Sequence, residues 1–105
     1  MLSDNSPRQK AMRKAMRKLV PRVPLADADE ILLRARQGHM VSLAPRDAVW
    51  LAVVSTIRHQ HTDYDALRNE GYDKESARHF VLEATNECLA EWGSSRFIET
   101  DNEGF

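Results

Sequence analysis

Apolar residues recur at helical spacing between the prolines and glycines that punctuate this chain. The first such run, residues 6–20, opens with Ser6 and Pro7, a capping hydroxyl followed by a proline at the first helical position, and Pro21 stops it. A second helix is predicted to follow Asp27 and to close at Gly38, because glycine readily adopts the conformation that ends helices. The pattern therefore predicts an all-α protein.

The most apolar stretch, AVWLAVV at residues 48–54, has two interpretations. Taken in isolation it is compatible with a buried strand, because it is apolar on every side. The preceding Pro45, its alanines and its continuation through Ile57 favour a central, nearly all-buried helix over residues 45–60. A long C-terminal helix is predicted over residues 74–92. At 105 residues the chain is expected to form a compact single-domain bundle of about five helices.

The two ends of the chain lack this periodicity. Residues 1–5 are predicted to be a flexible lead, residues 6–93 the helical domain, and residues 94–105 an acidic flexible tail. The single cysteine, Cys88, excludes an intramolecular disulfide and fits a reducing cytoplasm. No stretch approaches the roughly 18 apolar residues that a membrane span needs, and no apolar run opens the chain as in a secretory signal. We therefore expect a cytoplasmic protein without membrane contact.

Charge is distributed unevenly, although the formal net charge is only −1. The N-terminal run contains no acidic residue between Ser6 and Ala26, and its candidate binding residues are Arg8, Lys10, Arg13, Lys14, Arg17 and Lys18. Most of these recur at helical spacing and form one cationic face, which predicts contact with nucleic-acid phosphates or an acidic protein surface. The alternative is internal pairing with Glu83, Glu87 and Glu91 on the last helix. We favour external binding, because the cations outnumber these glutamates.

The polar stretch RHQHTDYD, residues 58–65, is predicted to join two helices. Cationic and histidine side chains at the end of the central helix interact favourably with its exposed carbonyls. Thr62 is expected to cap the next helix, with Asp65 at the capping-box position three residues later. A metal site is the competing interpretation, but its candidate ligands, His59, His61, Asp63 and His79, show no recognised spacing. We predict no metal and no cofactor.

Catalytic motifs are also absent from the sequence. It contains no glycine-rich phosphate loop, HExxH or GxSxG pattern, and Cys88 falls on an apolar stripe where a thiol is inert. We therefore predict no catalytic residue. Two alternatives remain open: a metal-dependent enzyme, and a scaffolding or homodimeric protein, which the sequence neither supports nor excludes. The candidate residues of such an enzyme are Arg58, His59, His61, Asp63 and Asp65.

Three stretches, PRQKAMRKAMRKLVPRVPL, LAPRDAVWLAVVSTIRHQHTDYDAL and EGYDKESARHFVLEATNECLAEWG, together resemble an uncharacterised bacterial and fungal family, domain of unknown function 2293. The resemblance covers roughly Pro7 to Trp92 and is most specific in IRHQHTDYD and GYDKESAR. It implies a bacterial cytosolic domain and carries no catalytic or binding role. The signature positions that it implies are Arg58, His59, Thr62, Tyr64, Asp65 and Arg78. Residues 66–84 also superficially resemble the helix–glycine–aromatic–helix turn of ubiquitin-associated-type modules, but a helix unbroken to Trp92 would differ from them.

Overall fold

The computed structural model describes residues 6–99 as a helical domain. Its elements are α1 (Pro7–Leu19), α2 (Leu25–Ala35), the 3₁₀ turn η1 (Gly38–Met40), α3 (Pro45–His61), α4 (Tyr64–Asn69), α5 (Lys74–Phe80) and α6 (Leu82–Glu91). No strand occurs in this range, so the predicted all-α class is confirmed. Residues 1–5 and 100–105, which hold the predicted lead and the end of the predicted tail, lie outside the described residues.

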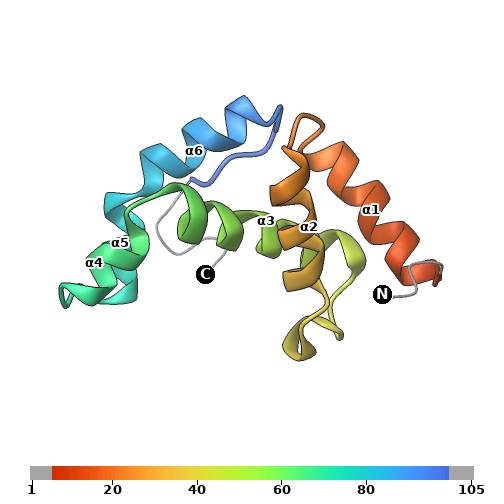
Figure 1. The fold of residues 1–105 in the computed structure, drawn as a ribbon, viewed down its shortest axis with the longest axis horizontal. Helices are drawn as coiled ribbons and strands as arrows, with labels where there is room; N and C mark the ends of the chain where they lie inside the picture. The colour runs from red at the N-terminus through yellow and green to blue at the C-terminus, as the bar shows by residue number, and fades with distance from the viewer. Residues whose placement is uncertain (1–5, 100–105) are drawn as a thin grey trace.

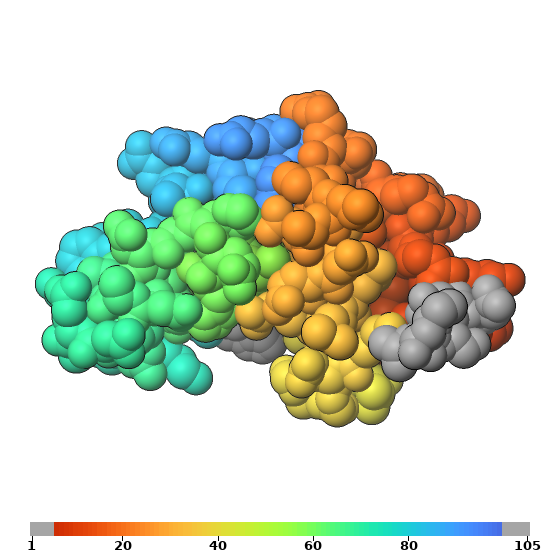
Figure 2. Space-filling view, in the orientation of Figure 1, coloured from red at the N-terminus to blue at the C-terminus, as the bar shows by residue number. Residues whose placement is uncertain are grey.

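The predicted apolar helix corresponds to α3, and it is the centre of the fold. Ala52, Val53 and Ile57 are fully buried within it. Helices α1, α2 and α6 all pack against α3, while α4 and α5 form a separate end of the molecule (Figure 1). The result is an elongated body of 41 × 27 × 22 Å, in which α1 forms one flank and the α4–α5 end the other (Figure 2). No helix in residues 6–99 has the length and apolarity needed to cross a membrane.

The prediction of one long helix over residues 74–92 is wrong in one respect, because the helix is interrupted at Val81. This residue has φ −103° and ψ 8°, and it separates α5 from α6. The two halves pack against different clusters: Ala77 of α5 lies in a small cluster with Tyr64 and Val81, whereas Leu89 of α6 lies in the main core. Tertiary packing thus overrides the helical pattern. The break also removes the expected difference from ubiquitin-associated-type modules, without establishing any relation to them.

The first part of the predicted flexible tail packs against the domain. Ile98 is only 3% exposed, and it belongs to the main core. Its backbone N–H donates to the side-chain carbonyl of Asn86, and the Asn86 amide donates back to the Ile98 carbonyl, both at 2.9 Å. Arg96 lies over the ring of Trp50, 4.1 Å from its centroid. The domain therefore extends at least to residue 98.

The loop between α1 and α2 is tied to the end of α6. The Arg22 guanidinium donates to the carbonyls of Ala90 and Glu91 in the last turn of α6. The Arg22 backbone N–H also donates to the Trp92 carbonyl at 2.9 Å. Gly93 follows with φ +85°, and a Cβ there would come within 2.9 Å of the Pro21 ring. This contact fixes the C-terminal end of α1 relative to the rest of the domain.

Candidate functional site

The cationic face of α1 is open to solvent. Ser6 caps the helix by accepting a hydrogen bond from the Gln9 backbone N–H, as the Ser-Pro opening predicted. Met12 and Met16 face the core. The exposed cations, which we call the basic face, are Lys10, Lys14, Arg17 and Lys18. At 100° per residue they lie on the side of the helix opposite the two buried methionines.

Two of the predicted binding residues lie outside this face. Arg8 is half-buried, and its guanidinium donates to the Met40 carbonyl at 3.0 Å, which ties α1 to η1. Arg13 is also half-buried. The basic face therefore contains only four of the six cations that the sequence suggested.

A shallow groove of about 430 Å³ runs along one edge of the basic face. Lys14 and Lys18 of α1 line it together with Arg46 from the first turn of α3 and Ser95 from the C-terminal segment. Its apolar part is made by Ala11, Ala15 and Leu19. Sequence reasoning missed Arg46, which is exposed. One signal was present: the helix dipole disfavours a cation in a first turn, so helix stability does not account for this arginine.

The alternative of internal charge pairing is not realised among the described residues. No ion pair within residues 6–99 joins Lys10, Lys14, Arg17 or Lys18 to the three glutamates of α6. Glu83, Glu87 and Glu91 are themselves exposed. Both helices pack on α3 rather than face to face along their lengths (Figure 1). The basic face therefore keeps its charge available to an external anion.

The RHQHTDYD stretch forms the junction between α3 and α4. The Thr62 hydroxyl donates to the Arg58 carbonyl at 2.6 Å and accepts from the Tyr64 backbone N–H at 3.2 Å, so it links the end of one helix to the start of the next. The predicted capping box does not form, because Asp63 rather than Thr62 is the N-cap of α4 and Thr62 is the C-cap of α3. Asp65 Oδ1 lies 2.5 Å from Nδ1 of His59, and the His59 and Tyr64 rings make a T-shaped contact.

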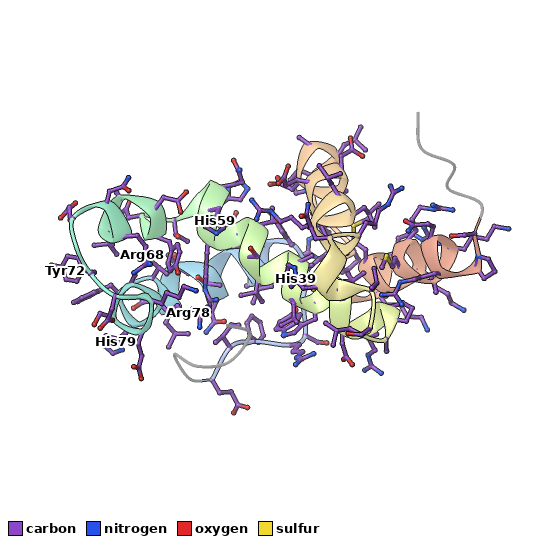
Figure 3. All side chains as sticks on the ribbon, turned by 90° about the horizontal axis from the view of Figure 1, so that it is seen from below. His39, His59, Arg68, Tyr72, Arg78 and His79 are labelled. Carbon is purple, nitrogen blue, oxygen red and sulfur yellow. The ribbon has the colours of Figure 1, made fainter. Side chains whose placement is uncertain are left out.

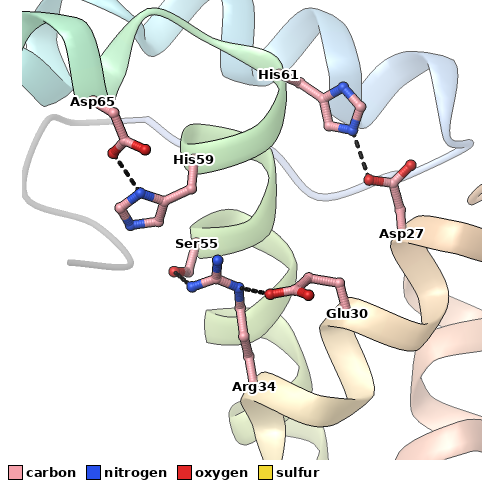
Figure 4. A network of polar contacts seen from close by, with 7 residues as sticks. All are labelled: Asp27, Glu30, Arg34, Ser55, His59, His61 and Asp65. Atoms are coloured by element: carbon pink, nitrogen blue, oxygen red, sulfur yellow. Dashed lines mark hydrogen bonds and ion pairs between the residues drawn. The ribbon is translucent and has the colours of Figure 1, made fainter.

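The second histidine of the stretch points elsewhere. Nε2 of His61 lies 2.6 Å from Asp27 Oδ1 at the start of α2 (Figure 4). The His61 and Trp92 rings make a T-shaped contact. His79 lies on α5, at the end of the molecule formed by α4 and α5 and away from His59 (Figure 3). Within residues 6–99, no group of three or more histidine, cysteine or acidic side chains is placed to hold a metal ion. The described residues therefore provide no support for the metal-dependent enzyme.

The positions implied as a family signature meet at this junction. Besides the His59, Thr62 and Asp65 contacts, Arg58 is only 4% exposed and Tyr64 is 7% exposed. Burial and the neighbouring Arg78 guanidinium lower the pKa of Arg58 to about 10, while Tyr64 acts in the opposite direction. Arg58 remains a cation at neutral pH. The signature positions thus lie together where α3, α4 and α5 meet, and the contacts of His59, Thr62 and Asp65 link α3 to α4.

The remaining nucleophile candidate, Cys88, is poorly suited to catalysis. Burial, followed by the negative charges of Glu91 and Asp27, raises its pKa to about 11. Because the thiolate is the reactive form of cysteine, this environment suppresses its nucleophilicity at neutral pH. The prediction of an inert thiol is consistent with this geometry.

The sequence matches a known family model. The model of an uncharacterized conserved protein family, DUF2293, matches residues 15–93, which is most of the sequence. The chain belongs to the DUF2293 family. It matches no curated protein and no solved structure. The DUF2293 match contains the whole α3–α4 junction together with Arg17, Lys18 and Arg46, whereas Lys10 and Lys14 precede it.

Proposed function

We propose that this DUF2293 protein is a small non-enzymatic binding module whose basic face contacts the phosphates of a nucleic acid. The observation that carries the proposal is the exposure of Lys10, Lys14, Arg17 and Lys18 on one side of α1. None of these four side chains pairs with an acidic side chain of the described residues. Cations aligned in this way neutralise successive phosphates and release condensed counterions, which supplies affinity largely independent of sequence.

The groove beside the basic face supports the same proposal. Arg46 adds a cation from a second helix, so the positive surface is wider than α1 alone. Such a surface also suits an acidic protein, which is the competing partner. We further propose that the module works in the bacterial cytoplasm, a location supported by the single half-buried cysteine.

Salt-dependent binding tests the proposal. Fluorescently labelled single-stranded and duplex oligonucleotides should bind the purified protein at low salt and dissociate steeply as salt rises. The slope of log K against log salt is negative. Replacing Lys10 and Arg17 with glutamine should reduce its magnitude by roughly 1.4 to 1.8, because each lost phosphate contact contributes about 0.7 to 0.9.

A matched control removes the same charge from the other end of the molecule. Arg68→Gln with Lys74→Gln changes exposed cations on α4 and α5, and it should leave the salt slope unchanged. If neither nucleic acid binds at low salt, or if the two double variants weaken binding equally, the proposal is wrong. Binding to an acidic polypeptide but to neither oligonucleotide would assign the face to a protein partner instead.

A further inference from the structure

The C-terminal segment beside the groove presents its side chains alternately inward and outward. Ser94 and Ile98 are buried, and Arg96 lies over Trp50. Ser95 and Phe97 are exposed, and 40% of Phe97 is accessible to solvent. The two hydrogen bonds between Asn86 and Ile98 hold the segment in this register. Phe97 is therefore an anchored aromatic ring at the surface rather than part of a loose tail.

Ser95 connects this ring to the cationic groove. It lines the groove with Lys14, Lys18 and Arg46, and it also lines a second hollow with Arg96, Phe97 and Glu99. The two hollows meet at Ser95, so the surface carries cations from two helices at one end and an exposed phenylalanine, with the carboxylate of Glu99 nearby, at the other. Among the described residues, no other aromatic ring pairs with Phe97.

We infer that this surface binds single-stranded nucleic acid, with the backbone along Lys14, Lys18 and Arg46 and an unpaired base on the ring of Phe97. The inference rests on the proposed function and specifies its substrate class. A positive groove that tracks the backbone beside an aromatic ring that stacks on a base is the combination that single strands require. Stacking tolerates any sequence, because every base has a flat face.

A duplex makes poorer use of the same surface. Its bases are stacked on one another and paired, so none offers a free face to Phe97, and only its phosphates can engage the cations. An acidic peptide would likewise use the lysines and Arg46 without requiring the aromatic ring. The position of Phe97 next to the groove therefore distinguishes the single strand from these two ligands.

The test compares affinities of the full chain for a short labelled oligothymidylate and for a duplex of the same length. Phe97→Ala should weaken single-strand binding on the order of tenfold, as expected for the loss of one stacked base, and should leave duplex binding unchanged. Phe97→Tyr should retain wild-type affinity, because it keeps the ring. Arg46→Gln should weaken both and lower the single-strand salt slope by roughly 0.7.

A second readout does not depend on the alanine variant. With Trp50→Phe and Trp92→Phe as background, Phe97→Trp should place a reporter whose fluorescence is quenched by the single strand and not by the duplex. If the wild type prefers the duplex, if Phe97→Ala leaves single-strand affinity unchanged, or if an acidic polypeptide binds as well as the oligothymidylate, the inference is overturned. In the first two cases the proposed function stands, whereas absence of all nucleic-acid binding overturns both.

Discussion

The side-chain amide of Asn86 pairs with the backbone of Ile98 through two hydrogen bonds of 2.9 Å each. In this contact a side chain of α6 supplies both the donor and the acceptor that a neighbouring strand would otherwise give. It joins a segment without helical periodicity to the main core, in which Ile98 is buried. The orientation of Arg96 and Phe97 depends on this anchor.

Loss of that anchor should release the segment. Asn86→Ala leaves the Ile98 N–H and carbonyl without their partners, so it should lower the free energy of unfolding by about 1–3 kcal/mol, measured by urea denaturation. The Ile98 amide should also exchange hydrogen faster. Asn86→Asp keeps the acceptor for the Ile98 N–H but sets a negatively charged oxygen against the Ile98 carbonyl, so it should not restore the stability that alanine loses. An alanine variant as stable as the wild type would show that Ile98 is held by burial alone.

Gly93 should be less tolerant of substitution than Gly71, although both have positive φ. A Cβ at Gly93 would lie 2.9 Å from the Pro21 ring, whereas nothing lies within 4 Å of a Cβ at Gly71. Both alanine variants should be destabilised by backbone strain of about 1–3 kcal/mol. Gly93→Ala should lose at least about 1 kcal/mol more through overpacking. Equal losses in thermal or urea unfolding would mean that the Pro21 contact yields without cost.

Thr62→Ala should destabilise the α3–α4 junction by about 1 kcal/mol, the usual cost of losing a capping hydroxyl. The variant removes the acceptor of the Tyr64 N–H and the donor to the Arg58 carbonyl. Thr62→Ser keeps the hydroxyl and should remain closer to the wild type in urea unfolding. If serine and alanine destabilise equally, the methyl group of Thr62 matters and the hydroxyl does not.

Cys88 should react slowly with iodoacetamide in the folded protein. Its pKa is raised from 9.0 to about 11, so at pH 8 its thiolate is about a hundredfold scarcer than that of an unperturbed thiol. The thiolate form increases as pH rises towards the folded pKa, and the rate should rise about tenfold per pH unit up to that point. Protein unfolded in urea is the control and should react at the ordinary rate. A native rate equal to the unfolded rate at pH 8 would contradict the burial of this thiol.

Local patterns were sufficient to predict most helices and failed where distant contacts decide the structure. Pro7 and Pro45 each begin a helix as expected, because proline suits a first turn wherever the chain is packed. The break at Val81 instead reflects tertiary packing, because the residues before and after it pack into two separate hydrophobic clusters. Nothing near Val81 in the sequence reveals that packing.

The candidate site shows the same division between local and distant information. The exposed cations of α1 follow from helical spacing alone. Arg46 and Phe97 join them only because α3 and the C-terminal segment fold beside α1. The spacing of residues within one segment cannot predict such a contact between segments. The binding of Ile98 by Asn86 was equally hidden, since residues 94–99 have no period that predicts burial.

Neutralising the basic face should leave the fold intact. Lys10, Lys14 and Arg17 are exposed and pair with no acidic side chain of the described residues, so the triple change to glutamine removes no ion pair and loses only the weak interaction of Arg17 with the dipole at the last turn of α1. Lys10 and Lys14 stand four residues apart on one helix face, where like charges repel. The relief of this repulsion offsets the lost interaction of Arg17 with the C-terminal end of α1, so the free energy of unfolding at low salt should change by no more than a few tenths of a kcal/mol, and this difference should shrink as salt screens both effects. A clear loss of stability at low salt that added salt abolishes would show that these cations are paired within the protein. The proposal that the basic face binds an external ligand would then be wrong.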